Sequence, residues 1–208
     1  MRCYCATFLS VILKLGRHSF ALEHANRAIA ASPSGEWQQR LRGYALNGLG
    51  RTREALESAR EAVRLAPRLP AAIRACAEME LANGLVRDAE RSADALLKIA
   101  PEWSETYDTL ALVALKQKKP AEAEYYCREA LRLNPNSYTS LNNMGVALLR
   151  QKKARESVNY FLEAAKKSPT KELPQKNLLG ALGSLYLSNS TIILVAIFIV
   201  LPALISVS

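Results

Sequence analysis

Apolar residues recur at steps of three and four along most of this chain. In residues 120–133, Ala123, Tyr126, Cys127 and Ala130 share one face of a predicted α-helix, and charged side chains occupy the opposite face. Nothing in the first 169 residues alternates between apolar and polar for long enough to indicate a β-strand. The pattern therefore predicts an all-α protein.

The helical pattern repeats with a period of 34 residues, which is marked by Pro33, Pro67, Pro101, Pro135 and Pro169. Twelve residues before these prolines stand Ala21, Ala55, Ala89, Ala123 and Ser157, and seventeen before them stand Gly16, Gly50, Gly84, Lys118 and Lys152. A small residue lets two helices approach closely, glycine or lysine fits the tight turn between them, and proline ends the second helix. Fixed periods of this length are typical of stacked helix-turn-helix units. We predict such units at about residues 2–33, 36–67, 70–101, 104–135 and 138–169.

This pattern resembles the tetratricopeptide repeat, whose signature places Leu-Gly and an aromatic residue on the first helix and Ala and Pro on the second. The last unit carries Leu141, Met144-Gly145, Leu148, Phe161, Ala164 and Pro169 at the matching positions. The resemblance covers about residues 2–169. It implies a right-handed superhelical solenoid of about five repeats that binds a protein or peptide partner and is not an enzyme.

The resemblance also implies where a partner would bind, because the first helix of each tetratricopeptide unit lines a concave groove. The residues it places there are Trp37, Arg40, Tyr44, Asn47, Arg74, Glu78, Asp108, Asn142 and Arg150. Arginine pairs carboxylates with bidentate geometry. An aromatic anchor beside Arg40 and Arg74 would therefore hold an acidic or carboxylate-bearing segment.

A long apolar segment follows the repeats. Residues 177–208 carry no charge, and residues 191–207 have the sequence TIILVAIFIVLPALISV. A helix over residues 187–207 would be about 31 Å long, enough for the ~30 Å hydrocarbon core of a bilayer. We therefore predict a transmembrane helix at residues 189–208 in contact with lipid. The alternative is a last helix buried against the repeats.

The flanks of this apolar segment predict its orientation. Lys166, Lys167, Lys171 and Lys176 precede it and no charged residue follows it, so the repeats should lie on the cytoplasmic side. The alanine- and arginine-rich composition favours a bacterial inner membrane, with an endoplasmic-reticulum-type membrane as the alternative. Between the repeats and the anchor, the leucines of residues 170–188 predict a capping helix or linker.

The start of the chain allows two interpretations. Residues 1–15 combine Arg2 with a mostly apolar stretch, as a secretory signal does. Phe8, Ile12 and Gly16 nevertheless fall in the repeat register, which favours the first helix of a repeat. The array also begins without a polar leading helix, so the sequence leaves open whether the chain is part of a longer protein.

Composition and charge narrow the function. Half of the residues are hydrophobic, which provides enough apolar surface for a shared core. The net charge of +9 is spread over every repeat among glutamates, so it predicts solvated helix faces and no nucleic-acid partner. Cys76 and Cys127 fall at small apolar positions and are expected to be buried thiols.

No catalytic motif or metal-ligand spacing occurs in the sequence, and His18 and His24 lie on one predicted helix. We therefore predict no enzyme activity, no cofactor and no metal site. The sequence favours a tail-anchored, membrane-tethered scaffold for protein–protein interactions. The alternatives are a non-catalytic repeat subunit of an enzyme or of a secretion or assembly complex, and an RNA-binding helical repeat.

Overall fold

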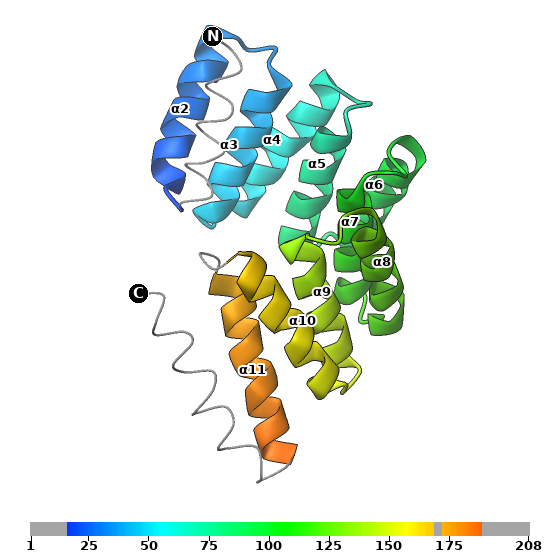
Figure 1. The fold of residues 1–208 in the computed structure, drawn as a ribbon. Helices are drawn as coiled ribbons and strands as arrows, with labels where there is room; N and C mark the ends of the chain where they lie inside the picture. Colours follow the sequence, from blue (N-terminus) through cyan, green and yellow to red (C-terminus); the bar gives the residue numbers. More distant parts are fainter. Residues whose placement is uncertain (1–15, 169–171, 189–208) are drawn as a thin grey trace. The chain divides into compact units, whose positions relative to one another are not determined.

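The computed structural model describes residues 16–168 and 172–188, and within these segments the regular secondary structure is entirely helical (Figure 1). The helices are α2 His18–Ala31, α3 Glu36–Gly48, α4 Thr52–Leu65, α5 Pro70–Ala82, α6 Val86–Ile99, α7 Ser104–Lys116, α8 Pro120–Leu133, α9 Tyr138–Arg150, α10 Ala154–Lys167 and α11 Glu172–Ser188. The prediction of an all-α solenoid is confirmed. The right-handed course of the superhelix stays a prediction.

One residue in each turn between paired helices lies in the left-handed region of backbone space. Gly50 and Gly84 have φ angles of 77° and 74°, and Lys118 and Lys152 have φ angles of 61° and 65°. Glycine adopts this conformation without steric strain, whereas an L-residue pays about 1 kcal/mol. The left-handed backbone of the turn therefore explains why three of the repeats have glycine at this position, whereas the two with lysine accept some strain.

The small residues of the repeat occupy the contact between helices. All five residues at this position are fully buried, namely Ala21, Ala55, Ala89, Ala123 and Ser157. Side-chain amides add a bond between neighbouring repeats. Asn83 Nδ2 donates to the Thr52 carbonyl at 2.9 Å, and Gln151 Nε2 donates to the Pro120 carbonyl at 3.2 Å. Packing and hydrogen bonding thus repeat with the sequence.

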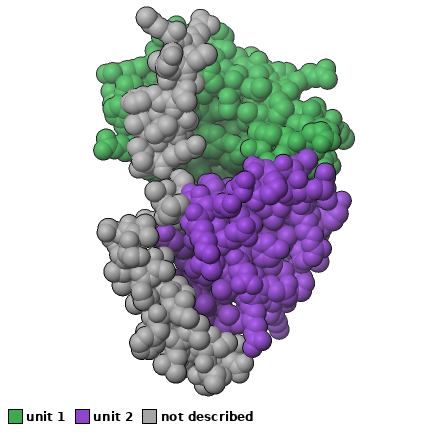
Figure 2. Space-filling model, viewed as in Figure 1, with its two compact units in different colours: residues 1–117 green, residues 118–208 purple. Residues whose placement is uncertain are grey.

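The chain divides into two compact units, residues 1–117 and 118–208 (Figure 2). The described helices α2 to α7 belong to unit 1, and α8 to α11 belong to unit 2. The boundary falls inside the predicted repeat 104–135. Within each unit, the helices that pack closely are one or two positions apart in chain order. Each unit therefore has its core built by neighbouring helices.

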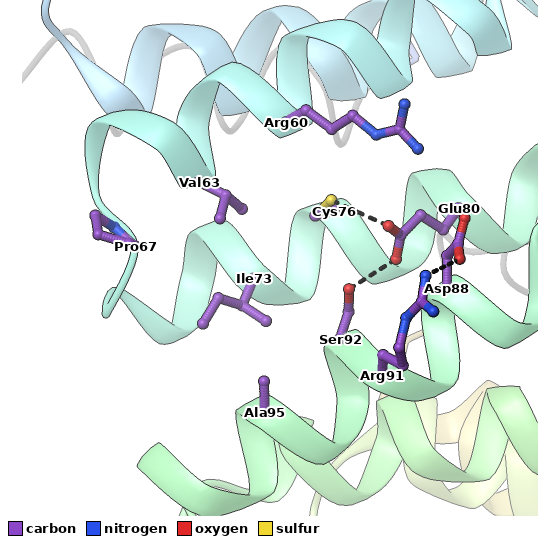
Figure 3. A pocket seen from close by; sticks show the side chains of 10 residues that line it. All are labelled: Arg60, Val63, Pro67, Ile73, Cys76, Glu80, Asp88, Arg91, Ser92 and Ala95. Atoms are coloured by element: carbon purple, nitrogen blue, oxygen red, sulfur yellow. Dashed lines mark hydrogen bonds and ion pairs between the residues drawn. The ribbon is translucent and has the colours of Figure 1, made fainter.

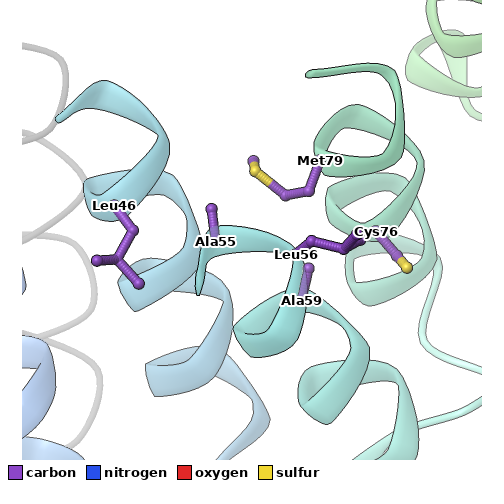
Figure 4. Packing of buried hydrophobic residues seen from close by; sticks show 6 residues of the cluster. All are labelled: Leu46, Ala55, Leu56, Ala59, Cys76 and Met79. Atoms are coloured by element: carbon purple, nitrogen blue, oxygen red, sulfur yellow. The ribbon is translucent and has the colours of Figure 1, made fainter. Parts of the chain in front are cut away.

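The centre of unit 1 is a cluster on three consecutive helices (Figure 4). Leu46 comes from α3, Ala55, Leu56 and Ala59 come from α4, and Cys76 and Met79 come from α5. Cys76 here and Cys127 in unit 2 are buried thiols, as the sequence predicted. This cluster fixes α3 and α5 beside each other.

The centre of unit 2 is the Phe161 ring. Phe161 is fully buried on α10 and packs against Leu178 and Ala181 of α11. A Cβ atom at Gly145 of α9 would lie 2.6 Å from a Phe161 ring carbon, so only glycine fits there without movement. Phe161 thereby joins the last repeat to the helix that follows it.

Helix α11 covers the last described repeat by packing against α10 and α9. The leucines of this helix do not all face the protein. Leu178 is buried, but Leu173 and Leu179 are 61% and 54% exposed. Helix α11 therefore buries a narrower face than its leucine content indicates.

Two predictions fall on residues outside the described segments: the first-repeat helix or signal in residues 1–15, and the transmembrane helix at residues 189–208. Among the helices of residues 16–168 and 172–188, none combines the length and the apolar character needed to cross a bilayer.

Candidate partner-binding face

The first helices of successive repeats form one continuous face in unit 1. Helix α3 packs against α5, and α5 packs against α7, so the three helices lie side by side. Their side chains bring together five of the predicted binding residues, namely Arg40, Tyr44, Arg74, Glu78 and Asp108. We call this surface, with Trp103, the α3–α5–α7 face.

Arg74 is the centre of this face. Its Nη1 lies 3.0 Å from Glu78 Oε1, and its Nη2 donates to the Tyr44 hydroxyl at 3.4 Å. The guanidinium carbon stands 5.6 Å from the centroid of the Trp103 ring, which is within cation–π range. Arg74 Nε is buried and has no hydrogen-bond partner among the described residues. One side chain thus links α3, α5 and the start of α7.

Burial perturbs the titration of this cluster. The Arg74 and Glu78 side chains are 31% and 26% exposed. Burial raises the pKa of Glu78 although Arg74 opposes the shift, and burial together with the Glu78 charge raises the pKa of Tyr44. Burial alone would lower the pKa of Arg74, but nearby carboxylates led by Glu78 outweigh it and raise that pKa. At neutral pH, Tyr44 is therefore neutral and Arg74 charged.

Arg40 is also paired within the protein. Its Nε donates to Glu36 Oε2 at 2.6 Å, one helical turn earlier, and both side chains are about three-quarters buried. Arg40 and Arg74 were expected to hold an acidic partner. Because each already holds a carboxylate of its own helix, we revise that expectation.

Carboxylates outnumber guanidinium groups around this face. The acidic residues that pair with or electrostatically affect its arginines are Glu36, Glu78, Glu105 and Asp108. The basic residues are Arg40 and Arg74. Around these two arginines there are thus four carboxylates for two guanidinium groups, although the chain as a whole has a net charge of +9.

The other predicted binding residues have structural partners or lie elsewhere. Trp37 packs against Ala25 and Leu41, and Asn47 is half-buried near the end of α3. In unit 2, the Asn142 side chain is buried and accepts a 2.8 Å hydrogen bond from Asn177 of α11. Arg150 is exposed at the end of α9. The structure therefore groups five of the nine predicted residues.

Trp103 was missed by the sequence analysis because it precedes α7 and so does not belong to a helix face. The signal that could have found it is an aromatic residue one position before a predicted first helix, where it can contact the preceding repeat. In the part of the chain that the structure describes, no cluster of histidine, cysteine and acidic residues could hold a metal ion.

Three segments of the chain match sequence models of the tetratricopeptide repeat: residues 41–69, 104–137 and 139–168. No curated protein matches the chain significantly.

Solved structures share the fold. TTC0263, a thermophilic protein of Thermus thermophilus, superposes with a TM-score of 0.78 at 18% identity, over 88% of this chain and 99% of its own. PilF of Pseudomonas aeruginosa superposes with a TM-score of 0.65 at 18% identity, over 91% and 92%. YrrB, described as having an unusual peptide-binding site, gives a TM-score of 0.51 at 18% identity, over 78% and 84%.

Proposed function

We propose that this chain, which carries tetratricopeptide repeats, is a scaffold whose α3–α5–α7 face binds a partner segment containing lysine or arginine. The repeat fold is typical of scaffolds for protein–protein interaction. The observation that carries the proposal is the excess of carboxylates around two arginines that are already paired. The peptide-binding site named for YrrB supports a peptide as the class of ligand.

The α3–α5–α7 face has apolar area that would contribute to affinity and charges that would select the sign of the partner's charge. The half-buried Trp103 and Tyr44 rings supply apolar area, and aromatic side chains are frequent energetic centres of interfaces. Glu78, Glu105 and Asp108 surround Arg74 and create a negative potential at the same place. A cationic segment would be steered to this face, whereas an acidic segment would meet like charges.

Neutralising the acidic side of the face is expected to weaken binding of a basic peptide. In a peptide array, peptides rich in lysine should bind the protein more tightly than matched peptides rich in glutamate. For a selected basic peptide, Glu105→Gln, at a half-buried carboxylate of this face that the arginines do not pair with, should raise the Kd about tenfold in fluorescence polarisation, because a charge-assisted contact contributes about 1.5 kcal/mol or more.

The matched control is Asp94→Asn, which removes an exposed carboxylate of α6 outside this face and should leave the Kd nearly unchanged. Circular dichroism establishes that both variants keep their helix content. Tighter binding of the glutamate-rich peptides, or equal losses in the two variants, would contradict the proposal.

We further propose that residues 189–208 tether this scaffold to a membrane, with the repeats on the cytoplasmic side. The proposal is supported by the uncharged apolar run of the sequence and by the lysines that precede it. A tether confines the binding face and its cargo to a thin layer, which raises their effective concentration without any new contact.

Charged residues in the apolar run are expected to release the protein from membranes. Each arginine in the middle of a spanning helix costs about 2.5 to 3.5 kcal/mol, so Leu194→Arg with Val200→Arg should cancel the favourable insertion energy. After carbonate extraction, the unchanged protein should stay in the membrane pellet and the double variant should move to the supernatant. If the unchanged protein is extracted, or the variant stays in the pellet, the tether is wrong.

A further inference from the structure

Unit 1 also has a pocket of about 360 Å³ between α4, α5 and α6 (Figure 3). It is separate from the α3–α5–α7 face, because α5 directs Arg74 and Glu78 to that face and Ile73, Cys76 and Glu80 to the pocket. Its volume is at the lower end of the range for small-ligand sites, about 300 to 1,000 Å³. It is therefore large enough for one or two side chains of a partner.

The pocket has an apolar end and a polar end. Val63, Pro67, Ile73 and Ala95 line the apolar end, as Figure 3 shows. Such a wall suits the methylene groups of a long side chain, which gain free energy when they leave water.

The polar end is built around the Glu80 carboxylate, and Glu80 is only 6% exposed. Ser92 Oγ donates to Glu80 Oε2 at 2.8 Å, and Cys76 Sγ donates to Glu80 Oε1 at 3.6 Å. Both donors are neutral, and Glu80 forms no ion pair with any described residue. Each carboxylate oxygen can accept a further hydrogen bond. A buried carboxylate that only neutral groups contact is strongly stabilised when a cation binds to it.

The two arginines that line the pocket do not supply that cation. The Arg91 guanidinium is paired with Asp88. Arg60 is exposed on α4 and forms no ion pair with any described residue. Its charge acts on the neighbouring Cys76 thiol, but water and salt screen it. Glu80 is thus a buried carboxylate that has no ion pair among the described residues and lies next to an apolar wall.

We propose that this pocket binds a lysine side chain of a partner protein. The four-carbon stem lies along Val63, Ile73 and Ala95, and the ammonium group donates to Glu80. A lysine stem with its compact point charge fits an apolar wall that leads to a single carboxylate. The site is independent of the α3–α5–α7 face.

The test uses the full chain and three small probes: Nα-acetyl-lysine methylamide, its uncharged norleucine analogue, and the acidic glutamate analogue. Methyl signals of Val63, Ile73 and Ala95, and aromatic signals of Trp103 and Tyr44, are followed by NMR during titration. The lysine probe should shift them saturably, with a Kd at least about fivefold lower than that of the norleucine probe, because only the lysine probe reaches Glu80 with a charge. Shifts centred on Trp103 and Tyr44 would instead place the probe on the other face and overturn the proposal.

Two substitutions localise the effect. Glu80→Gln removes the charge but keeps one acceptor oxygen, which can serve Ser92 or Cys76, and it should raise the Kd of the lysine probe about tenfold. Asp88→Asn removes a carboxylate already paired with Arg91 at the same pocket and should change the Kd less than about twofold. Both variants should keep the dispersion of the methyl spectrum.

Three further results would overturn the proposal. The first is equal binding of the lysine and norleucine probes, and the second is an unchanged Kd in Glu80→Gln. The third is tighter binding of the glutamate probe, which would make Arg60 the binding group.

Discussion

Phe161→Ala is expected to lower the free energy of unfolding of unit 2 by about 3 to 5 kcal/mol. Phe161 is fully buried and touches α11 through Leu178 and Ala181 while its ring fills the space left by Gly145 of α9. The truncation removes apolar contacts on three helices at once and leaves a cavity. Urea unfolding followed by circular dichroism measures the change, and α11 should lose amide protection first.

Leu162→Ala is the matched control, because Leu162 is the next residue on α10 but is 37% exposed. Its effect should stay below about 1 kcal/mol. Gly145→Ala should destabilise the unchanged protein by about 1 to 3 kcal/mol through overpacking, and much less in the Phe161→Ala background. Similar losses for Phe161→Ala and Leu162→Ala would contradict the packing described for unit 2.

Raising the pH above about 9 is expected to destabilise unit 1 through Cys76. Burial, and then the charge of Glu80, raises the pKa of the Cys76 thiol from 9.0 to about 12. The unfolded chain therefore loses this proton before the folded protein does. The stabilisation is complete below pH 9 and is lost as the pH rises toward 12, so the thiol alone should lower the unfolding free energy by about 2 kcal/mol near pH 10.5.

Tyr44, whose pKa is also raised by burial, adds to the same alkaline loss above its ordinary value of 10.0. Urea unfolding under reducing conditions, compared at about pH 8 and about pH 10.5, measures the sum. Cys76→Ala should lower stability at both pH values but remove most of the 2 kcal/mol difference. An equal pH difference in Cys76→Ala and in the unchanged protein would show that the thiol does not ionise in this way.

The repeat positions could be predicted from sequence because the same backbone requirement returns in every unit. Gly50 and Lys152 look unrelated as amino acids, yet both lie in the left-handed region of the same turn. Ala89 and Ser157 are likewise both fully buried, each at the equivalent position of its own repeat. In a periodic chain the same local requirement can thus be seen in several repeats, which makes the prediction of its helices and turns robust.

The chemistry of the binding face was less predictable because it depends on which partners each charge finds. The pairs Glu36–Arg40 and Arg74–Glu78 have the four-residue spacing of helical ion pairs, so the sequence did contain a signal for them. The stacking of Trp103 on Arg74 connects a loop with another repeat, and no helix-face argument places it.

The covering of Asn142 by Asn177 depends on the position of α11, which a narrow apolar face sets. Leu173 and Leu179 have the composition of buried residues but remain exposed. Composition predicted that a helix follows the repeats, and packing decided which of its residues face the protein.

Close packing inside each unit involves helices that are one or two positions apart along the chain. Every helix therefore meets its partners soon after it leaves the ribosome, without waiting for a distant segment to be synthesised. The unit can assemble in the order of translation. Its apolar surface then stays uncovered only for the time needed to make the next pair of helices.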